Sequence, residues 1–303
     1  MPKKVLVICG ATASGKTRLA VDCALKLNTE IISADSQLIY KGLNVGTAKP
    51  TEEETCGVKH HMIDIVEPTE TFSVSDYSER ALPILESLLS EGKTPIICGG
   101  TGFYINSLLF DFGYGNTAAD ENVRKKYAEY LNNNGKEALF EKLREVDPES
   151  SAVLHPNDTK RVIRALEIFE VSGKKKSEQN DELIPKYDFI AVSINYPREE
   201  LYARINRRVD EMFDKGLVEE VQSLLVRGIN GSCQCMQAIG YKEVVFGLEN
   251  GSLRSTMSDI IKQNTRHYAK RQITFFKKMP NLVWLNPNEA TADKVAEILN
   301  EIN

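Results

Sequence analysis

The amino-acid sequence predicts an α/β fold in which a parallel sheet is covered on both faces by helices. Six short apolar runs, the first at residues 3–10 and the last at residues 281–286, are separated by longer amphipathic segments. Alternation of this kind is typical of parallel strands joined by helical crossovers. Two further observations support this prediction: a glycine-rich loop follows the first run, and a long charged segment lies in the middle of the chain.

The glycine-rich loop reads GATASGKT and matches the phosphate-binding pattern G-x-x-x-x-G-K-[ST] at every position. It lies between the apolar run VLVIC and the helical pattern RLAVDCALKL, which is the context that this motif requires. Backbone N–H groups at a helix start bind anions, Lys16 would reach the outer phosphate oxygens, and the Thr17 hydroxyl would ligate Mg²⁺. We therefore expect a P-loop NTPase-like core. The residues expected to bind the phosphates are Gly10, Ala11, Thr12, Ala13, Ser14, Gly15, Lys16 and Thr17. Most such loops hold ATP or GTP, and the motif by itself does not name the reaction.

Polar residues follow the second and the fourth apolar runs. The run at residues 30–35 leads into ADSQLIY with Asp35 and Ser36, and the run at residues 94–100 leads into GGTGFY with Thr101. Ligands of open parallel sheets bind at the carboxyl ends of the strands. Asp35 is therefore a candidate general base, with a helix cap or a turn as the alternative role. The glycines around Thr101 favour a close approach of the backbone to a ligand.

The middle of the chain differs from its flanks. Residues 113–186 are charged, rich in Asn, Lys and Glu, and helical in their hydrophobic period, without a convincing strand. We predict a helical insertion over the mouth of the sheet, within a catalytic core formed by residues 1–112 and 187–303. Three further helices are expected between the insertion and the last strand.

A basic and aromatic strip lies between Thr265 and Lys278, in a protein whose net charge is −5. It reads TRHYAKRQITFFKK and contains five Lys or Arg residues and no acidic residue. Such a strip suits a solvated basic helix face packed through its aromatic side chains, and it suits contact with nucleic acid or phosphate equally well. The pattern alone leaves both interpretations open.

The composition is that of an ordinary soluble globular protein. No run of about 18 uninterrupted apolar residues occurs, and the N-terminus leads directly into a predicted core strand. We therefore expect a cytoplasmic protein without membrane contact. The six cysteines lack the paired spacing of a zinc site, so reduced thiols are expected.

Taken together, the motifs resemble those of the bacterial tRNA dimethylallyltransferases, also called tRNA isopentenyltransferases. The matching segments, in chain order, are GATASGKT, DSQLIYKGLNVGTAKPT, HHMIDI, GGTGFY, RVIRALEI, AIGYKE and TRHYAKRQITFF. The resemblance runs from Val5 to about Leu285, which is nearly the whole chain. The last segment and the block from DSQLIY to GTAKP are far more specific than the phosphate loop.

The resemblance implies a reaction and roles for residues in it. The family transfers a dimethylallyl group from dimethylallyl diphosphate to N6 of the adenosine directly 3′ of the anticodon in tRNA, and it releases diphosphate. The phosphate loop then holds a leaving group, with Mg²⁺ at Thr17 as the implied cofactor. Asp35 is implied as the base for the weakly nucleophilic amine, and Thr101 as the residue that orients the adenosine. Lys16 and Arg204 are implied as catalytic groups at the diphosphate, with Arg208 as a second arginine there.

The resemblance also implies contacts with the tRNA anticodon stem-loop, and it favours nucleic-acid contact for the basic strip. The target base has to leave its stack, and we expect residues 113–186 to clamp the stem-loop of this partner. A monomer is expected. The residues implied to contact tRNA are Asp35, Ser36, Gln37, Leu38, Thr101, Arg124, Lys160, Arg161, Val162, Ile163, Arg164, Gln237, Ala238, Ile239, Gly240, Tyr241, Lys242, Arg266, Lys270 and Arg271.

The sequence departs from the family pattern at three positions. Ala11 replaces the usual Pro, and Phe275 replaces a common Trp. In DSQLIY the Gln is one position earlier than in most members, so Leu38 takes the place of the usual base-contacting residue and Gln37 precedes it. Either Gln37 or Leu38 could therefore take the position from which the family's Gln contacts the base.

Three other functions remain open at this point. An isopentenyltransferase that acts on free adenine nucleotides would use the same chemistry without tRNA. A small-molecule kinase would share the loop and the sheet, but it has less use for the insertion and the basic strip. A non-catalytic RNA-binding protein would leave Asp35, Thr101 and Arg204 without a role.

Overall fold

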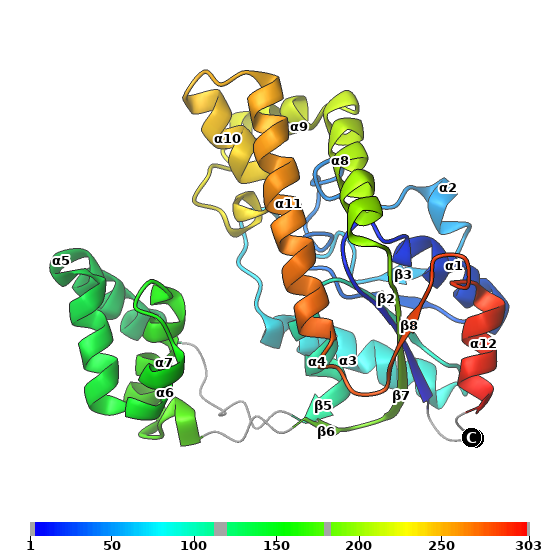
Figure 1. The fold of residues 1–303 in the computed structure, drawn as a ribbon, viewed down its shortest axis with the longest axis horizontal. Helices are drawn as coiled ribbons and strands as arrows, with labels where there is room; N and C mark the ends of the chain where they lie inside the picture. The colour runs from blue at the N-terminus through cyan, green and yellow to red at the C-terminus, as the bar shows by residue number, and fades with distance from the viewer. Residues whose placement is uncertain (1–3, 112–119, 179–182, 302–303) are drawn as a thin grey trace. The chain divides into compact units, whose positions relative to one another are not determined.

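The computed structural model describes residues 4–111, 120–178 and 183–301, and the chain forms two compact units (Figure 1). One unit consists of Met1–Leu109 and Lys186–Asn303, and the other of Phe110–Pro185. The expected boundary between residues 112 and 113 lies outside the described residues. The first unit therefore assembles from two segments that the second unit separates in the sequence.

The first unit contains a six-stranded parallel sheet in the order β3-β2-β4-β1-β7-β8. β1 lies inside the sheet, where Leu6 is opposite Ile96 of β4 and Ile190 of β7. Five of the six apolar runs each contain a strand, and β3 overlaps the third run, residues 61–66, only at His61; the prediction of a parallel α/β sheet is confirmed. The strands are β1 (Lys4–Cys9), β2 (Ile31–Ser33), β3 (His60–His61), β4 (Ile96–Gly99), β7 (Asp188–Ile194) and β8 (Leu282–Leu285).

Helices cover both faces of this sheet. Leu6 and Ile8 of β1 belong to a core cluster with residues of α1 and α12, which pack on one face. α3 and α4 lie on the opposite face (Figure 1). Successive side chains of a strand point to opposite faces of the sheet. Because helices cover both faces, the side chains of a buried strand are mostly apolar, and the strand is a nearly continuous apolar run in the sequence. These helices are α1 (Lys16–Leu27), α12 (Ala292–Glu301), α3 (Val74–Ser90) and α4 (Gly102–Leu109), and the short α2 spans Glu52–Thr55.

Four helices lie between β7 and β8 and surround the carboxyl edge of the sheet. α8 and α11 pack together through Ile205 and Ala269, and the same cluster contains Ala11 of the phosphate loop. Three of the four were expected from the sequence, whereas α10 was recognised only as a motif. None of the described helices is long and apolar enough to cross a membrane. The helices are α8 (Arg198–Asp214), α9 (Leu217–Val226), α10 (Tyr241–Glu249) and α11 (Arg254–Phe276), with a 3₁₀ turn η2 at Gln234–Gln237.

The second unit is mainly helical and has a core of its own. Leu139, Phe140 and Leu143 pack against Val162 and Leu166. It also contains a two-stranded antiparallel ribbon that the helical period did not indicate, because its strands are only two residues long and one includes a proline. The elements are α5 (Glu121–Val146), α6 (Pro148–Val153), α7 (Thr159–Ser172), the 3₁₀ turn η1 (Lys176–Glu178), β5 (Phe110–Asp111) and β6 (Ile184–Pro185).

The loops after β1, β2 and β4 approach one another closely at the carboxyl edge. The Ala34 N–H donates to the Cys98 carbonyl at 2.8 Å, and the Thr101 N–H donates to the Ala34 carbonyl at 3.0 Å. A Cβ atom added at Gly99 would lie 2.0 Å from the Ala34 carbonyl oxygen. A glycine is therefore required where β4 ends, because the backbone after β2 occupies the space of a side chain.

We predict that Gly99→Ala destabilises the sheet unit by about 2 kcal/mol, since overpacking against backbone costs roughly 1–3 kcal/mol. Gly231→Ala is the control, because a Cβ atom there would make an ordinary contact of 3.5 Å with Val245. It should change the free energy of unfolding by less than about 0.5 kcal/mol. Denaturant unfolding followed by the fluorescence of Trp284 on β8, the only tryptophan, reports on this unit. Equal stabilities of the two variants would contradict the prediction.

Candidate active site

Two adjoining pockets open at the carboxyl edge of the sheet. The first, of about 390 Å³, is lined by Asp35 and is called the Asp35 pocket. The second, of about 640 Å³, is lined by Arg204 and is called the Arg204 pocket. Both are lined by Lys16, Thr17 and Arg208, so the phosphate loop and one arginine stand where the pockets meet.

The phosphate loop wraps around the start of α1. The Lys16 ammonium donates to the Ala11 carbonyl at 3.2 Å, and burial lowers the pKa of Lys16. A bound anion would oppose this shift, because an opposite charge favours the protonated amine. Thr12, Ala13, Gly15, Lys16 and Thr17 line the pockets, whereas Gly10, Ala11 and Ser14 are buried.

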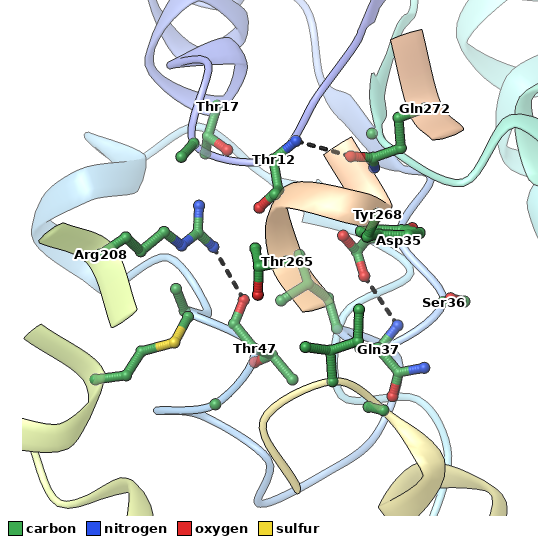
Figure 2. A pocket seen from close by; sticks show the side chains of 18 of the residues that line it. Thr12, Thr17, Asp35, Ser36, Gln37, Thr47, Arg208, Thr265, Tyr268 and Gln272 are labelled. Atoms are coloured by element: carbon green, nitrogen blue, oxygen red, sulfur yellow. Dashed lines mark hydrogen bonds between the residues drawn. The ribbon is translucent and has the colours of Figure 1, made fainter. Parts of the chain in front are cut away.

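Asp35 is held in the Asp35 pocket by the backbone that follows it. Its Oδ1 accepts the Gln37 N–H at 2.9 Å, and the Thr101 Oγ1 accepts the Ser36 N–H at 3.0 Å. Tyr268 of α11 hydrogen-bonds Thr101 through its side chain, and burial raises the pKa of Tyr268 to about 12. Figure 2 shows Tyr268 beside Asp35. A carboxylate and a protonated phenol therefore line this pocket, whereas Thr101 is not among its lining residues and is bonded to the Ser36 backbone and to Tyr268.

Two arginines of α8 face the phosphate loop, because residues four apart lie on one side of a helix. The Arg204 Nε donates to the Ala13 carbonyl at 2.8 Å, and its guanidinium lies 4.6 Å from the centre of the Tyr196 ring. The Arg208 Nη2 donates to the Thr47 carbonyl at 3.3 Å (Figure 2). Burial lowers the pKa of Arg208, and the charge of Asp35 opposes that shift. An arginine stays charged in proteins, so both side chains offer fixed positive charge to an anion.

The chain matches the family model described as IPP transferase over residues 38–279. The tRNA dimethylallyltransferase of Acetivibrio thermocellus is 46% identical over 96% of this chain and 94% of its own length. The chain belongs to the tRNA dimethylallyltransferase family. This confirms the resemblance drawn from the motifs.

Solved structures of related proteins support the fold. The tRNA isopentenylpyrophosphate transferase from Bacillus halodurans is 41% identical with a TM-score of 0.73, covering 99% of this chain and 95% of that chain. A eukaryotic dimethylallyltransferase, described as acting on tRNA, is 28% identical with a TM-score of 0.82, covering 99% of this chain and 79% of that chain. The P-loop-like core expected from the sequence is confirmed by this similarity.

In this member of the dimethylallyltransferase family, many residues expected at tRNA lie around the Asp35 pocket. Arg271 lines it, Lys270 is exposed nearby on α11, and Arg266 donates to the Asn206 side chain at 2.7 Å. Tyr241 is fully buried and Gly240 is buried, so they shape the wall below the surface. The other expected residues that line this pocket are Ser36, Gln37, Leu38, Gln237, Ala238, Ile239 and Lys242.

The remaining residues expected at tRNA lie in the second unit and differ in exposure. Lys160 and Arg161 of α7 are exposed, whereas the Val162 side chain is 1% exposed and Ile163 packs against the same core. The Val162 side chain is therefore not available to RNA, because it completes the core of α5 and α7. Arg124 and Arg164 each pair with the buried carboxylate of Glu167, at 2.9 and 2.7 Å.

Gln272 joins two loops of the site, and the sequence analysis did not single it out. Its Oε1 accepts the Thr12 N–H at 2.9 Å, and its Nε2 donates to the Gly100 carbonyl at 3.0 Å. Tyr268, also missed, precedes it by one turn on the same face of α11. The sequence does contain one indication of this role. Tyr268 and Gln272 are four residues apart in an otherwise basic helix, and this spacing places two uncharged polar side chains on one face.

We predict that Gln272→Ala lowers the free energy of unfolding by about 2–4 kcal/mol, since the buried Gly100 carbonyl and the half-buried Thr12 N–H lose their partners at roughly 1–3 kcal/mol each. The variant should also bind inorganic diphosphate about tenfold more weakly, because Thr12 is no longer held. Gln263→Ala, at an exposed position of the same helix, is the control and should leave both quantities unchanged. Calorimetry with Mg²⁺ and diphosphate measures the affinity, and an unaltered affinity would contradict the role of Gln272.

Proposed function

We propose that the chain transfers the dimethylallyl group of dimethylallyl diphosphate to N6 of the adenosine directly 3′ of the anticodon in tRNA. The observation that carries this proposal is the junction of the two pockets at Lys16, Thr17 and Arg208. A phosphate loop on one side and a carboxylate on the other suit the departure of diphosphate and the loss of a proton from an amine. Membership of the tRNA dimethylallyltransferase family supports the same reaction.

The Arg204 pocket is proposed to hold the diphosphate of the donor. Seven Lys or Arg side chains and two Glu side chains line it, so its charge complements a phosphate anion. The basic residues are Lys16, Arg18, Lys49, Arg204, Arg207, Arg208 and Lys215. Together with the N–H groups of the loop, they would stabilise the negative charge that grows on the leaving diphosphate.

The Asp35 pocket is proposed to hold the adenine, with the dimethylallyl group at the junction. The N6 lone pair forms a bond to C1 of the dimethylallyl group, and the bond from C1 to the diphosphate oxygen breaks. The electron pair of the broken bond goes to diphosphate, and the N6 proton goes to the Asp35 carboxylate. Tyr268 lines this pocket with Asp35, and Thr101 hydrogen-bonds both Tyr268 and the Ser36 backbone, so the two residues would orient the flipped base by hydrogen bonding and by contact with the phenol ring.

The residues at the loop fit a Mg²⁺ ion shared with the diphosphate. Mg²⁺ commonly keeps several waters and takes one or two protein ligands in addition to substrate phosphates. The described residues contain no group of three or more His, Cys, Asp or Glu side chains placed to hold a metal ion. The Thr17 hydroxyl, which lines both pockets, would ligate it, and the ion would neutralise charge on the leaving diphosphate.

Residues of both units are proposed to hold the anticodon stem-loop. In the first unit, Gln237, Lys242 and Arg271 line the Asp35 pocket, and the exposed Lys270 precedes Arg271 on α11. In the second unit, which corresponds to the insertion expected at residues 113–186, exposed basic side chains of α7 would contact the RNA backbone. The protein is proposed to act as a monomer.

We predict that Asp35→Ala lowers the rate of label transfer from dimethylallyl diphosphate to an anticodon stem-loop by about a hundredfold or more, as general-base removal does. Asp293→Ala, which changes an exposed carboxylate of α12, is the control and should transfer at the wild-type rate. An adenine nucleotide and ATP are tested alongside. Label in the nucleotide alone would favour the free-adenine transferase, and ATP turnover without transfer would favour a kinase.

We predict that chelation of divalent metal with EDTA abolishes transfer and that added Mg²⁺ restores it. Thr17→Ala should raise the Mg²⁺ concentration needed for half-maximal rate by about tenfold, because one ligand is lost. Thr17→Ser keeps the hydroxyl and should stay close to the wild type. A Mg²⁺ titration of the initial rate measures this, and identical curves for the Ala and Ser variants would remove Thr17 from the metal site.

A further inference from the structure

The loop at residues 43–49, which reads LNVGTAK, forms a wall of both pockets. Gly46 and Thr47 line the Asp35 pocket, Asn44 and Val45 line the Arg204 pocket, and Ala48 lines both. The Ala48 N–H donates to the Val45 carbonyl at 3.0 Å, so the loop closes on itself as a tight turn. Its conformation therefore affects the walls of the two pockets together.

The N–H groups at the beginning of this turn have no partner within it, as at the first turn of a helix. A single carboxylate from α9 accepts them. Oε2 of Glu220 accepts the N–H groups of Asn44 and Val45, both at 2.8 Å, and Oε1 accepts the Gly46 N–H at 3.1 Å. Bonds to an ionised acceptor are stronger than neutral ones, so this one side chain fixes three successive residues of the loop.

Tyr241 of α10 supports the same carboxylate. Its hydroxyl donates to Oε1 of Glu220 at 2.6 Å, and the residue is fully buried. Burial raises the pKa of Tyr241, and the charge of Glu220 raises it further, so the phenol keeps the proton that it donates. A Cβ atom added at Gly46 would lie 2.5 Å from the Tyr241 ring, so the loop rests directly on that ring.

The other side of the turn presents a carbonyl to the arginine at the junction. The Thr47 carbonyl accepts a hydrogen bond from Nη2 of Arg208 at 3.3 Å (Figure 2). Thr47 is the next residue after the three that Glu220 holds. The position of the Arg208 guanidinium therefore depends on a carboxylate that lines neither pocket.

We propose that Glu220 is a positioning residue that, with Tyr241, holds loop 43–49 so that the Thr47 carbonyl orients Arg208 toward the phosphate loop. The inference rests on the proposed function only for the identity of the ligand as a diphosphate ester. Arg208 lines both pockets, so its orientation governs how well an anion at Lys16 and Thr17 is bound. Loss of the carboxylate would release the loop and allow the guanidinium to move away, which weakens anion binding.

The probe for the test is inorganic diphosphate with Mg²⁺, whose dissociation constant is measured by calorimetry on the full chain. Glu220→Gln retains the size of the side chain but replaces one carboxylate oxygen by an amide NH₂ group. That group cannot accept a hydrogen bond from the backbone N–H groups of the loop. The dissociation constant of this variant should rise by about tenfold. Glu219→Gln is the matched control, because the neighbouring carboxylate is 63% exposed and forms a loose ion pair with Arg254 at 3.8 Å. The control should bind diphosphate as the wild type does.

A double-mutant cycle with Arg208→Ala separates positioning from a general structural effect. If Glu220 acts through Arg208, Glu220→Gln changes the dissociation constant by less than about twofold once the arginine is absent, because coupled residues are not additive. A full tenfold loss in the Arg208→Ala background would overturn the inference. So would a Glu220→Gln protein that binds diphosphate within about twofold of the wild type.

Tyr241→Phe provides a second variant that removes only one of the four hydrogen bonds of Glu220 and retains the buried ring. It should weaken diphosphate binding about threefold, in the same direction and with the same dependence on Arg208. If Glu220→Gln does not fold, this variant decides the question, and unaltered binding would overturn the inference. Wild-type protein that binds diphosphate but transfers nothing to RNA would refute the proposed function and leave the role of Glu220 intact.

Discussion

The loops at the carboxyl edge of the sheet carry backbone N–H and C=O groups that they cannot pair among themselves, and the candidate active site depends on how these groups are satisfied. A buried backbone group without a partner costs roughly 1–3 kcal/mol. Helices from the last third of the chain supply the partners. Gln272 of α11 bridges Thr12 and Gly100, and Glu220 of α9 accepts three successive N–H groups. The phosphate loop and the 43–49 loop therefore gain their shape from the completed fold.

α8 and α11 carry residues proposed for the chemistry, because the α-helical period places residues four apart on one face. Arg204 and Arg208 are four residues apart on α8, as are Tyr268 and Gln272 on α11. Each pair faces the loops at the sheet edge, while exposed positions such as Lys270 remain at the surface. A rigid helix can thus hold one polar face against the site and a second face toward a large ligand.

Charge is distributed so that an acidic chain can bind polyanions. The net charge is −5, yet Lys and Arg outnumber Glu by seven to two among the residues that line the Arg204 pocket. Local potential, and not the total, determines what a cleft attracts. In the second unit, the buried Glu167 pairs with Arg124 and Arg164, whose side chains are still 41% and 37% exposed, and Lys160 is exposed as well.

The sequence by itself determined the parallel sheet, the phosphate loop, the family and the candidates Asp35, Thr101 and Arg204, because each depends on residues that are neighbours in the chain or on a recognisable motif. Only the tertiary structure decided that Gln272, Tyr268 and Glu220 belong to the site, and that the Val162 side chain does not face solvent. Gln272 lies 260 residues from its partner Thr12, and Glu220 lies 175 residues from Val45. The four-residue spacing of Tyr268 and Gln272 marks one face of α11, but the partners of that face and of Glu220 follow from how packed layers meet and leave no pattern in the sequence.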